Sequence, residues 1–246
     1  MSTRDYFSQQ SKAYATFRPT YPEDLYQFIF KHLKNQSIAW DCATGNGQVA
    51  QYLAKHFQTV YATDISRQQI DQAFKADNIF YSVSKAEQTS FPDHEFDLIT
   101  VGQALHWINT DEFYSEVRRT AKPGALLAVW GYALLSVNEA IDKLFLDFYH
   151  NTIGPYWDAA RKLVEEQYRN VPFPFERIPS PEFSLCVEWT PEQFAGYLTS
   201  WSATQKYIKV NGSDPVPAFN EVIRQHWNKD EKKTVTFPLF LKLGRV

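Results

Sequence analysis

Short apolar runs alternate with amphipathic segments from Ser37 to Val129, and this alternation constrains the fold more than any other feature of the chain. Such a pattern is typical of βα units that build a parallel sheet, with right-handed crossovers placing helices over its faces. Strands are predicted at residues 37–42, 58–64, 79–84, 96–101 and 125–130. The chain is therefore expected to be an α/β protein with a doubly wound sheet.

Helix caps and turn residues separate these strands. Ser66 is placed to cap a helix that runs to about residue 76, and a second helix is predicted from Thr110 to Thr120. Pro123-Gly124 predicts a turn before the fifth strand. The strands should therefore be joined by short, well-defined connections.

The sequence pattern changes after residue 135. Residues 136–180 carry aromatic-rich helical segments, which predict a helical cap inserted into the sheet domain. Strands are predicted at 183–188 and 235–243, with a helix at 190–201 between them. We expect a single domain over residues 1–246, made of an N-terminal segment (1–36), a ligand-binding core (37–135), the cap (136–180) and C-terminal elements that complete the sheet (181–246).

The charge and composition of the chain argue against several classes of partner. The formal net charge of −3 lacks the basic excess that binding a phosphate backbone requires, so no nucleic acid partner is expected. The two cysteines, Cys42 and Cys186, have neither a disulfide nor a metal-site spacing, which favours the reducing cytoplasm and predicts no metal. No apolar run has the length of a signal peptide core or a membrane span, so we expect a soluble protein without a membrane partner.

A glycine-containing turn follows the first predicted strand and reads Asp41-Cys42-Ala43-Thr44-Gly45-Asn46-Gly47. Glycines between a strand and a helix allow the backbone to approach a ligand closely and to adopt angles closed to other residues. Asp64 ends the second strand, where its carboxylate can accept both ribose hydroxyls of a nucleoside cofactor. An acid that only caps the next helix is the alternative for Asp64, but Ser66 is already placed for that role.

Two cofactors fit this turn. Residues 45–50 satisfy G-x-G-x-x-A, so a nicotinamide dinucleotide and an oxidoreductase activity are one alternative. Asp41 argues against it, because a carboxylate is unfavourable near a pyrophosphate and favourable near the cationic methionine moiety of S-adenosylmethionine. The residues therefore favour S-adenosyl-L-methionine.

With these motifs, the chain resembles the class I S-adenosylmethionine-dependent methyltransferases, and within them the branch of trans-aconitate methyltransferase-like and embryo-abundant-type proteins. The resemblance rests on the turn 41–47, on Asp64, on Lys85-Ala86-Glu87 and on the fourth-strand motif at 97–107. Ala43 stands where the family pattern has its first glycine. The resemblance implies a Rossmann-like sheet of seven strands with an antiparallel C-terminal strand, and an N-terminal segment that covers the cofactor.

Carried over residue by residue, the resemblance implies a set of cofactor-binding residues. They are Tyr14, Arg18, Asp41, Ala43, Thr44, Gly45, Gly47, Asp64, Ile65, Ala86, Glu87, Gln103 and Ala104. Tyr14 and Arg18 lie in the segment that would close over the methionine end of the cofactor. A packed aromatic residue and a solvated surface arginine are the alternatives for these two.

Methyl transfer from a sulfonium is a direct displacement, so the protein chiefly has to align the groups and exclude water. A general base is needed for hydroxyl, thiol or protonated nitrogen acceptors but not for a carboxylate. His106 follows the fourth strand and either orients the acceptor, acts as its base or merely ties the loop to the backbone. The predicted substrate-binding residues are His106, Trp107, Trp130, Tyr132, Trp157 and Trp201.

These residues predict a methyltransferase that acts on a small-molecule acceptor. The nearest relatives in the branch suggest a carboxylic acid oxygen, with which Arg161, Arg169 or Arg177 could pair. A protein that binds S-adenosylmethionine without turnover, as the partner subunit of an enzyme, is the alternative. The sequence does not predict the oligomeric state.

Overall fold

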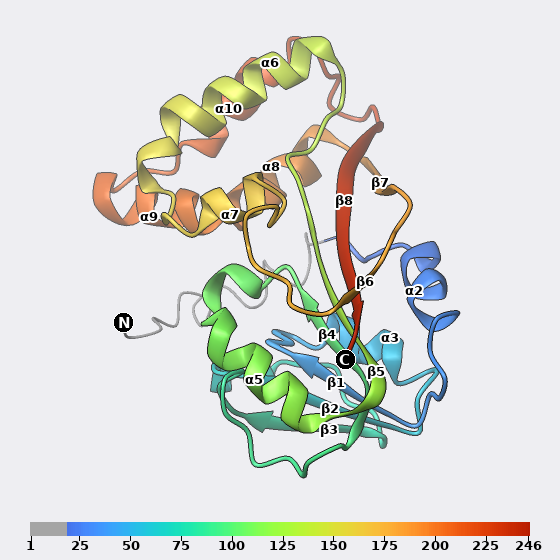
Figure 1. Ribbon diagram of the computed structural model, residues 1–246. Coiled ribbons are helices and arrows are strands. Elements are labelled where there is room, and N and C mark those ends of the chain that lie inside the picture. Colours follow the sequence, from blue (N-terminus) through green and yellow to red (C-terminus); the bar gives the residue numbers. More distant parts are fainter. Residues whose placement is uncertain (1–18) are drawn as a thin grey trace.

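The computed structural model describes residues 19–246, which form one eight-stranded mixed sheet with helices around it (Figure 1). The strands are β1 (Ile38–Cys42), β2 (Thr59–Asp64), β3 (Ile79–Val83), β4 (Phe96–Gly102), β5 (Ala121–Tyr132), β6 (Glu176–Ile178), β7 (Phe183–Trp189) and β8 (Lys233–Arg245). Their order is β3-β2-β1-β4-β5-β8-β6, with β7 also paired to β8. The predicted α/β class and doubly wound sheet are confirmed.

The five parallel strands, β1 to β5, carry helices on both faces. These helices are α2 (Glu23–Phe30), α3 (Gln48–Leu53), α4 (Arg67–Asp71), the 3₁₀ turn η2 (Leu105–Trp107) and α5 (Thr110–Thr120). Successive strand side chains face opposite ways, so Ala39 joins one core with α2 and α3, and Trp40 joins the other with α5. Every residue of β4 from 96 to 101 is buried, as expected for a central strand covered on both faces.

The C-terminal strands complete the sheet with an antiparallel strand, as predicted, but the whole sheet has eight strands rather than the predicted seven. β8 runs antiparallel beside β5, with Leu126 opposite Arg245 and Tyr132 opposite Leu239. On its other side β8 pairs with both β6 and β7, so its outer neighbour is interrupted. Pro179 and Pro181 lie in the interruption, and proline removes the backbone donor that a continuous ladder requires. The edge position is thereby divided into two strands.

Two predicted boundaries are wrong. The helix capped by Ser66 ends at Asp71 rather than near residue 76, because the backbone N–H of Phe74 turns toward the glycine loop and bonds the Asn46 carbonyl at 3.3 Å. Pro123-Gly124 does not end the connection before β5 but lies inside that strand. There the pairing with β4 shifts register, and Gly124 has a φ of +82°, so the dipeptide forms a local irregularity. The predicted helix 110–120 is confirmed.

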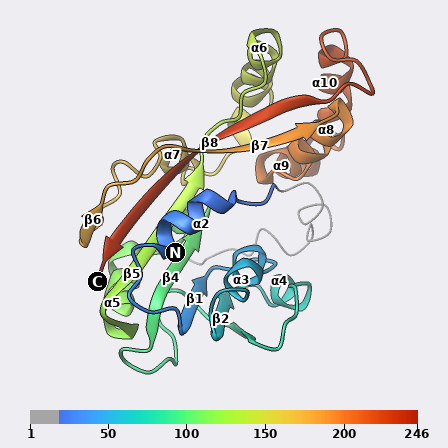
Figure 2. The same ribbon diagram turned by 90° about the vertical axis from the view of Figure 1, so that its right-hand side faces the viewer.

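Helices from two parts of the chain form one layer beyond the sheet, reached by the long strands β7 and β8 (Figures 1 and 2). They are α6 (Glu139–Asp147), the π-helical turn η3 (Phe148–Thr152), η4 (Gly154–Tyr156), α7 (Arg161–Glu165), α8 (Pro191–Thr199), α9 (Ser202–Asn211) and α10 (Val216–Ile223). Phe148 of the predicted cap packs on Phe219 of α10, with 4.5 Å between ring centres. The helical layer therefore includes chain from both sides of residue 180.

Among the residues that the structure describes, no helix is long and apolar enough to cross a bilayer.

Candidate active site

The glycine loop between β1 and α3 is fixed in place by backbone contacts to β2. The Thr44 N–H bonds the Thr63 carbonyl at 2.9 Å, and the Gly45 N–H bonds a carboxylate oxygen of Asp64 at 2.8 Å. Gly47 has a φ of +82°, and a Cβ built there would lie 2.2 Å from the Tyr81 hydroxyl oxygen. Gly45 also has a positive φ, but a Cβ there would meet nothing within 4 Å. The loop is open at Gly45 and closed at Gly47.

Asp64 lies at the tip of β2, beside the glycine loop. One of its carboxylate oxygens accepts the Gly45 N–H, and the other accepts the Ser66 N–H at 2.8 Å. A carboxylate has about four acceptor positions, so it can bind further hydroxyl donors while it holds the loop. Ser66 is the N-cap of α4, as predicted, because its hydroxyl accepts the Gln69 N–H. The ribose role of Asp64 stays a prediction, and the observed contacts are compatible with it.

Asp41 is 1% exposed at the floor of the loop, where it accepts three hydrogen bonds. The donors are the Thr44 hydroxyl, the Ala50 N–H at 3.1 Å and the Thr100 hydroxyl at 2.9 Å. Burial raises the pKa of Asp41 from 3.8 to about 7, although these hydrogen bonds act in the opposite direction. The protein therefore holds a titratable carboxyl group beneath the loop, where a nearby cation would stabilise its charged form.

Asp41→Asn is expected to remove a pH-dependent part of the stability. Since the folded pKa is raised, the folded protein keeps a proton between about pH 4 and pH 7 that the unfolded chain has released. The Asp41 contribution to stability is thus favourable at low pH and falls as pH rises to about 7. In thermal unfolding of the ligand-free protein, the Tm of the variant relative to that of the wild type should be higher at pH 8 than at pH 5. An equal difference at both pH values would contradict the raised pKa.

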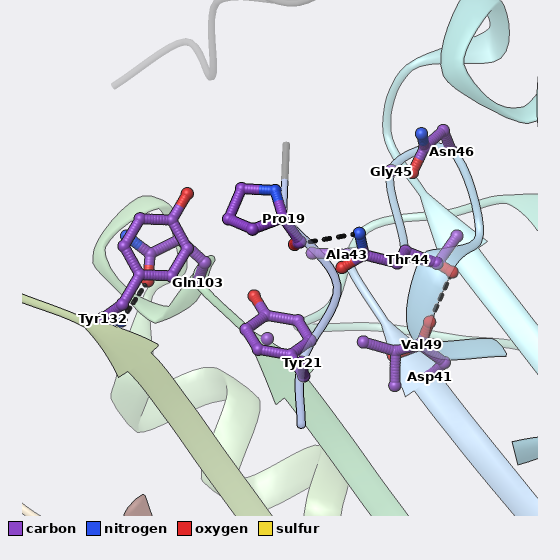
Figure 3. A pocket seen from close by; sticks show the side chains of 12 residues that line it. Pro19, Tyr21, Asp41, Ala43, Thr44, Gly45, Asn46, Val49, Gln103 and Tyr132 are labelled. Atoms are coloured by element: carbon purple, nitrogen blue, oxygen red, sulfur yellow. Dashed lines mark hydrogen bonds between the residues drawn. The ribbon is translucent and has the colours of Figure 1, made fainter. Parts of the chain in front are cut away.

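A pocket opens over this loop, with an empty volume of about 540 Å³, part of it open to solvent (Figure 3). Small-molecule pockets are typically roughly 300–1,000 Å³. Of the predicted cofactor-binding residues it brings together Asp41, Ala43, Thr44, Gly45 and Gln103, and with them the predicted substrate-binding residue Tyr132. The pocket is also lined by Pro19, Tyr21, Asn46, Gln48, Val49 and Gly102, which the sequence analysis did not assign as site residues.

Pro19 and Tyr21 bring the N-terminal segment to the pocket. The Gln48 side chain donates to the Pro19 carbonyl at 3.1 Å and so ties this segment to the first turn of α3. Figure 3 shows Pro19 and Tyr21 between the glycine loop on one side and Tyr132 on the other. Predicted cofactor residues Tyr14 and Arg18 lie outside the described residues, so their roles stay predictions.

The far wall of the pocket is held by Gln103. Its φ is +56°, and its N–H bonds the Trp130 carbonyl at 2.8 Å. Its side-chain oxygen accepts the Tyr132 N–H, also at 2.8 Å. A Cβ on Gly131 would lie 2.6 Å from that same oxygen, so the glycine leaves room for the amide. The side-chain amide of Gln103 is consequently fixed at the pocket wall, where its nitrogen is a donor group.

His106 meets the helical layer rather than the pocket wall. Its Nδ1 lies 2.8 Å from the hydroxyl of Tyr168, a buried residue that follows α7. Burial, and secondarily the charge of Arg161, lower the pKa of His106 to about 3, so the imidazole is neutral at physiological pH. His106 also packs on Trp107, with ring centres 4.7 Å apart. Of the three sequence alternatives for His106, a strong general base is the least compatible with this environment.

Of the remaining predicted aromatic residues, Trp130 and Trp201 lie in a hydrophobic core and Trp157 is half-buried against it. Trp130 is fully buried, packs edge-on against Tyr21 at 5.4 Å and lies behind Gly102, whose Cβ would approach its ring to 3.4 Å. Trp157 and Trp201 pack on one another in the helical layer at 5.4 Å. Trp130 thus supports the pocket from behind, while the other two pack on each other within the helical layer. Their substrate contacts stay predictions.

Of the predicted cofactor residues that the structure describes, six do not line this pocket. Gly47 and Asp64 belong to the glycine loop and the β2 tip described above, and the other four lie near the strand tips. Ile65 is 42% exposed directly after Asp64, whereas Ala86 and Ala104 are buried. Glu87 accepts the N–H of Asn109 at 2.9 Å and so holds the start of α5. Their roles toward a cofactor also stay predictions.

The fold and the loop define an α/β protein that binds a nucleoside-containing cofactor at the carboxyl ends of its strands. A family model described as a methyltransferase domain matches residues 40–129. A Dictyostelium discoideum protein that bears the name of a methyltransferase is 33% identical, over 98% of this chain and 95% of its own length. The methyltransferase cfoB of Aspergillus candidus is 29% identical, over 69% of this chain and 61% of its own length.

A solved structure extends the comparison to three dimensions. It belongs to a protein described as a type II methyltransferase from Anaeromyxobacter dehalogenans, which is 34% identical to this chain. The match covers 94% of this chain and 98% of that one, with a TM-score of 0.86. The chain therefore belongs to the class I S-adenosylmethionine-dependent methyltransferases. Family membership argues against the nicotinamide alternative. The narrower trans-aconitate and embryo-abundant branch stays a prediction.

The residues present fit S-adenosylmethionine. Gly45 leaves open space beside Asp64, which would hold the ribose, and Asp41 places a carboxyl group beneath the pocket that would favour a cationic methionine end. Gln103 would donate from the opposite wall. When bound, this cofactor supplies an electrophilic methyl group.

Proposed function

We propose that this chain transfers a methyl group from S-adenosylmethionine to a carboxylate oxygen of a small organic acid. The observation that carries the proposal is the position of a cation, Arg161 at the start of α7, beside the η2 turn that holds the neutral His106 after β4. Both groups suit an anionic acceptor that needs no base.

Arg161 is held among aromatic residues. Its guanidinium carbon lies 4.8 Å from the centre of the Trp157 ring, and its Nε donates to the Tyr149 hydroxyl at 2.9 Å. Its side chain is only 16% exposed, and Glu165 lies 4.0 Å away. A partly desolvated guanidinium binds a carboxylate more strongly than a surface arginine does, because water screens it less. Arg169 and Arg177, the other predicted partners, are exposed.

The proposed methyl transfer to a carboxylate requires no proton transfer. A lone pair of the carboxylate oxygen forms the new O–C bond, and the electrons of the breaking C–S bond go to sulfur, which becomes a neutral thioether. A carboxylic acid is already ionised at neutral pH. His106, with a pKa of about 3, would be a poor base for a hydroxyl acceptor. The residues of this chain would therefore act by binding, orientation and exclusion of water.

Turnover tests the proposal directly. The purified protein is incubated with S-adenosylmethionine and a panel of small mono-, di- and tricarboxylic acids, and each acid is paired with its primary amide and its alcohol. We expect methyl esters from one or more acids and no product from the neutral analogues. Methylation of the alcohols instead would overturn the carboxylate assignment. Cofactor binding without turnover on any acceptor would support the partner-subunit alternative.

Arg161→Gln is expected to raise KM for the acid acceptor by at least about tenfold, because the variant loses a charge-assisted hydrogen bond. S-adenosylhomocysteine affinity should stay within about twofold. Arg169→Gln is the matched control, since Arg169 is exposed and its side chain hydrogen-bonds only Gln167 among the contacts of the described residues. Steady-state kinetics with both substrates varied measures the two effects. A rise in KM that is the same in both variants would contradict the assignment.

A further inference from the structure

The contact between His106 and Tyr168 joins two segments that are 62 residues apart in the sequence. Tyr168 has a φ of +53°, and Gln167 before it has one of +55°, backbone angles that side-chain-bearing residues rarely adopt. The chain holds this conformation through the bond from the Tyr168 N–H to the Leu163 carbonyl at 2.8 Å. Phe240 of β8 packs edge-on against the phenol ring at 5.2 Å. The hydroxyl is thus held at Nδ1 by a strained turn and by packing.

The direction of this hydrogen bond follows from the single proton of the phenol. Burial raises the pKa of Tyr168, so the hydroxyl keeps its proton at neutral pH. Among the hydrogen bonds of the described residues, Nδ1 of the neutral imidazole is the acceptor within reach of that proton. When Nδ1 accepts, the imidazole proton resides on Nε2.

We propose that Tyr168 is a positioning residue that fixes neutral His106 in the tautomer protonated at Nε2, so that His106 offers the acceptor a hydrogen-bond donor rather than a base. The tautomer assignment stands on the contacts of the chain itself. Only the last step, donation to the acceptor, rests on the proposed function. The charged and titratable groups that face His106 are Arg161 of α7 and Tyr168, and neither one favours an imidazolium.

Nitrogen NMR reads the tautomer without turnover. The protein is labelled with ¹⁵N-histidine, and the His106 signals among its six histidines are assigned with His106→Asn. We expect an unprotonated Nδ1 and a protonated Nε2 in the wild type, unchanged from neutral pH down to about pH 5. A protonated Nδ1, or an imidazolium in that range, would overturn the proposal, whether or not any variant folds.

Tyr168→Phe tests the cause, with Tyr114→Phe as the matched control. Tyr114 is buried in the same core as Tyr168, but its hydroxyl donates to the Pro172 carbonyl at 2.8 Å. Tyr168→Phe should give a mixture of the two tautomers and lower kcat by about tenfold, while the control keeps the wild-type tautomer and a kcat within about twofold. An unchanged tautomer in Tyr168→Phe would overturn the proposal. Failure to methylate any acid, with the expected tautomers, would count against the proposed function alone.

Discussion

Gly47→Val is expected to lower the affinity for S-adenosylhomocysteine by at least about 100-fold, equivalent to about 2.7 kcal/mol. The Cβ of a valine at this position would lie 2.2 Å from the Tyr81 hydroxyl oxygen, and a φ of +82° is strained for any branched residue. Tyr81 is a rigid ring, so relief requires a shift of β3 or of the glycine loop. Because the same loop carries Gly45 and its bond to Asp64, such a shift would displace the cofactor contacts. Isothermal calorimetry measures the effect.

Gly212→Val separates backbone strain from damage to the site. Gly212 ends α9 with a φ of +72°, and a Cβ there would meet nothing within 4 Å. This control should lose thermal stability and keep its affinity for S-adenosylhomocysteine. Equal binding losses in Gly47→Val and Gly212→Val would show that strain, rather than the site, is responsible.

Tyr81→Phe identifies the obstructing atom. The Tyr81 hydroxyl is buried and has no hydrogen-bond partner among the described residues, so its removal alone should cost little. Gly47→Ala with Tyr81→Phe should bind S-adenosylhomocysteine more tightly than Gly47→Ala alone, since the atom at 2.2 Å is gone and the nearest carbon of the ring lies at 3.1 Å. No recovery in the double variant would assign the loss to the backbone angle.

The difference between Gly47 and Gly45 marks how far the sequence could predict this site. The spacing of glycines after an apolar strand predicts the loop, and the loop is present. The spacing does not show which glycine has a side chain packed against its Cα. Tyr81, which packs against Gly47, belongs to β3, a strand that begins more than thirty residues later and pairs with β2. Local motifs predict backbone geometry, and long-range packing decides which side chain sits behind it.

The same limit applies to Tyr168. His106 is recognisable from its position after the fourth strand, but no periodicity or motif connects it with a tyrosine in the cap. Trp130 shows the same limit, since its position at a strand end predicts a substrate contact, which stays a prediction, but does not show that the side chain is buried behind Gly102. Gly102 itself could have indicated this burial, because a glycine inside a strand often marks a place where a neighbouring group packs closely against the backbone.

Asp64→Ala is expected to weaken S-adenosylhomocysteine binding by about 1–3 kcal/mol, or about 5- to 150-fold. Two losses combine: the carboxylate that would accept the ribose hydroxyls, and the acceptor that fixes the Gly45 and Ser66 N–H groups at 2.8 Å. The second loss also destabilises the ligand-free protein, because partly buried donors are left unpaired. Calorimetry on folded protein must therefore be accompanied by thermal unfolding with and without ligand.

Asp97→Ala is the control that separates these two losses. Asp97 is 5% exposed and also accepts two backbone N–H groups, those of Ser37 at 3.1 Å and Ile38 at 2.9 Å. It lies near the start of β4, at the opposite end of the parallel strands from Asp64 at the tip of β2. Both variants should unfold at lower temperature, and only Asp64→Ala should lose affinity while folded. If both lose affinity equally, Asp64 is a structural anchor, and the ribose assignment fails.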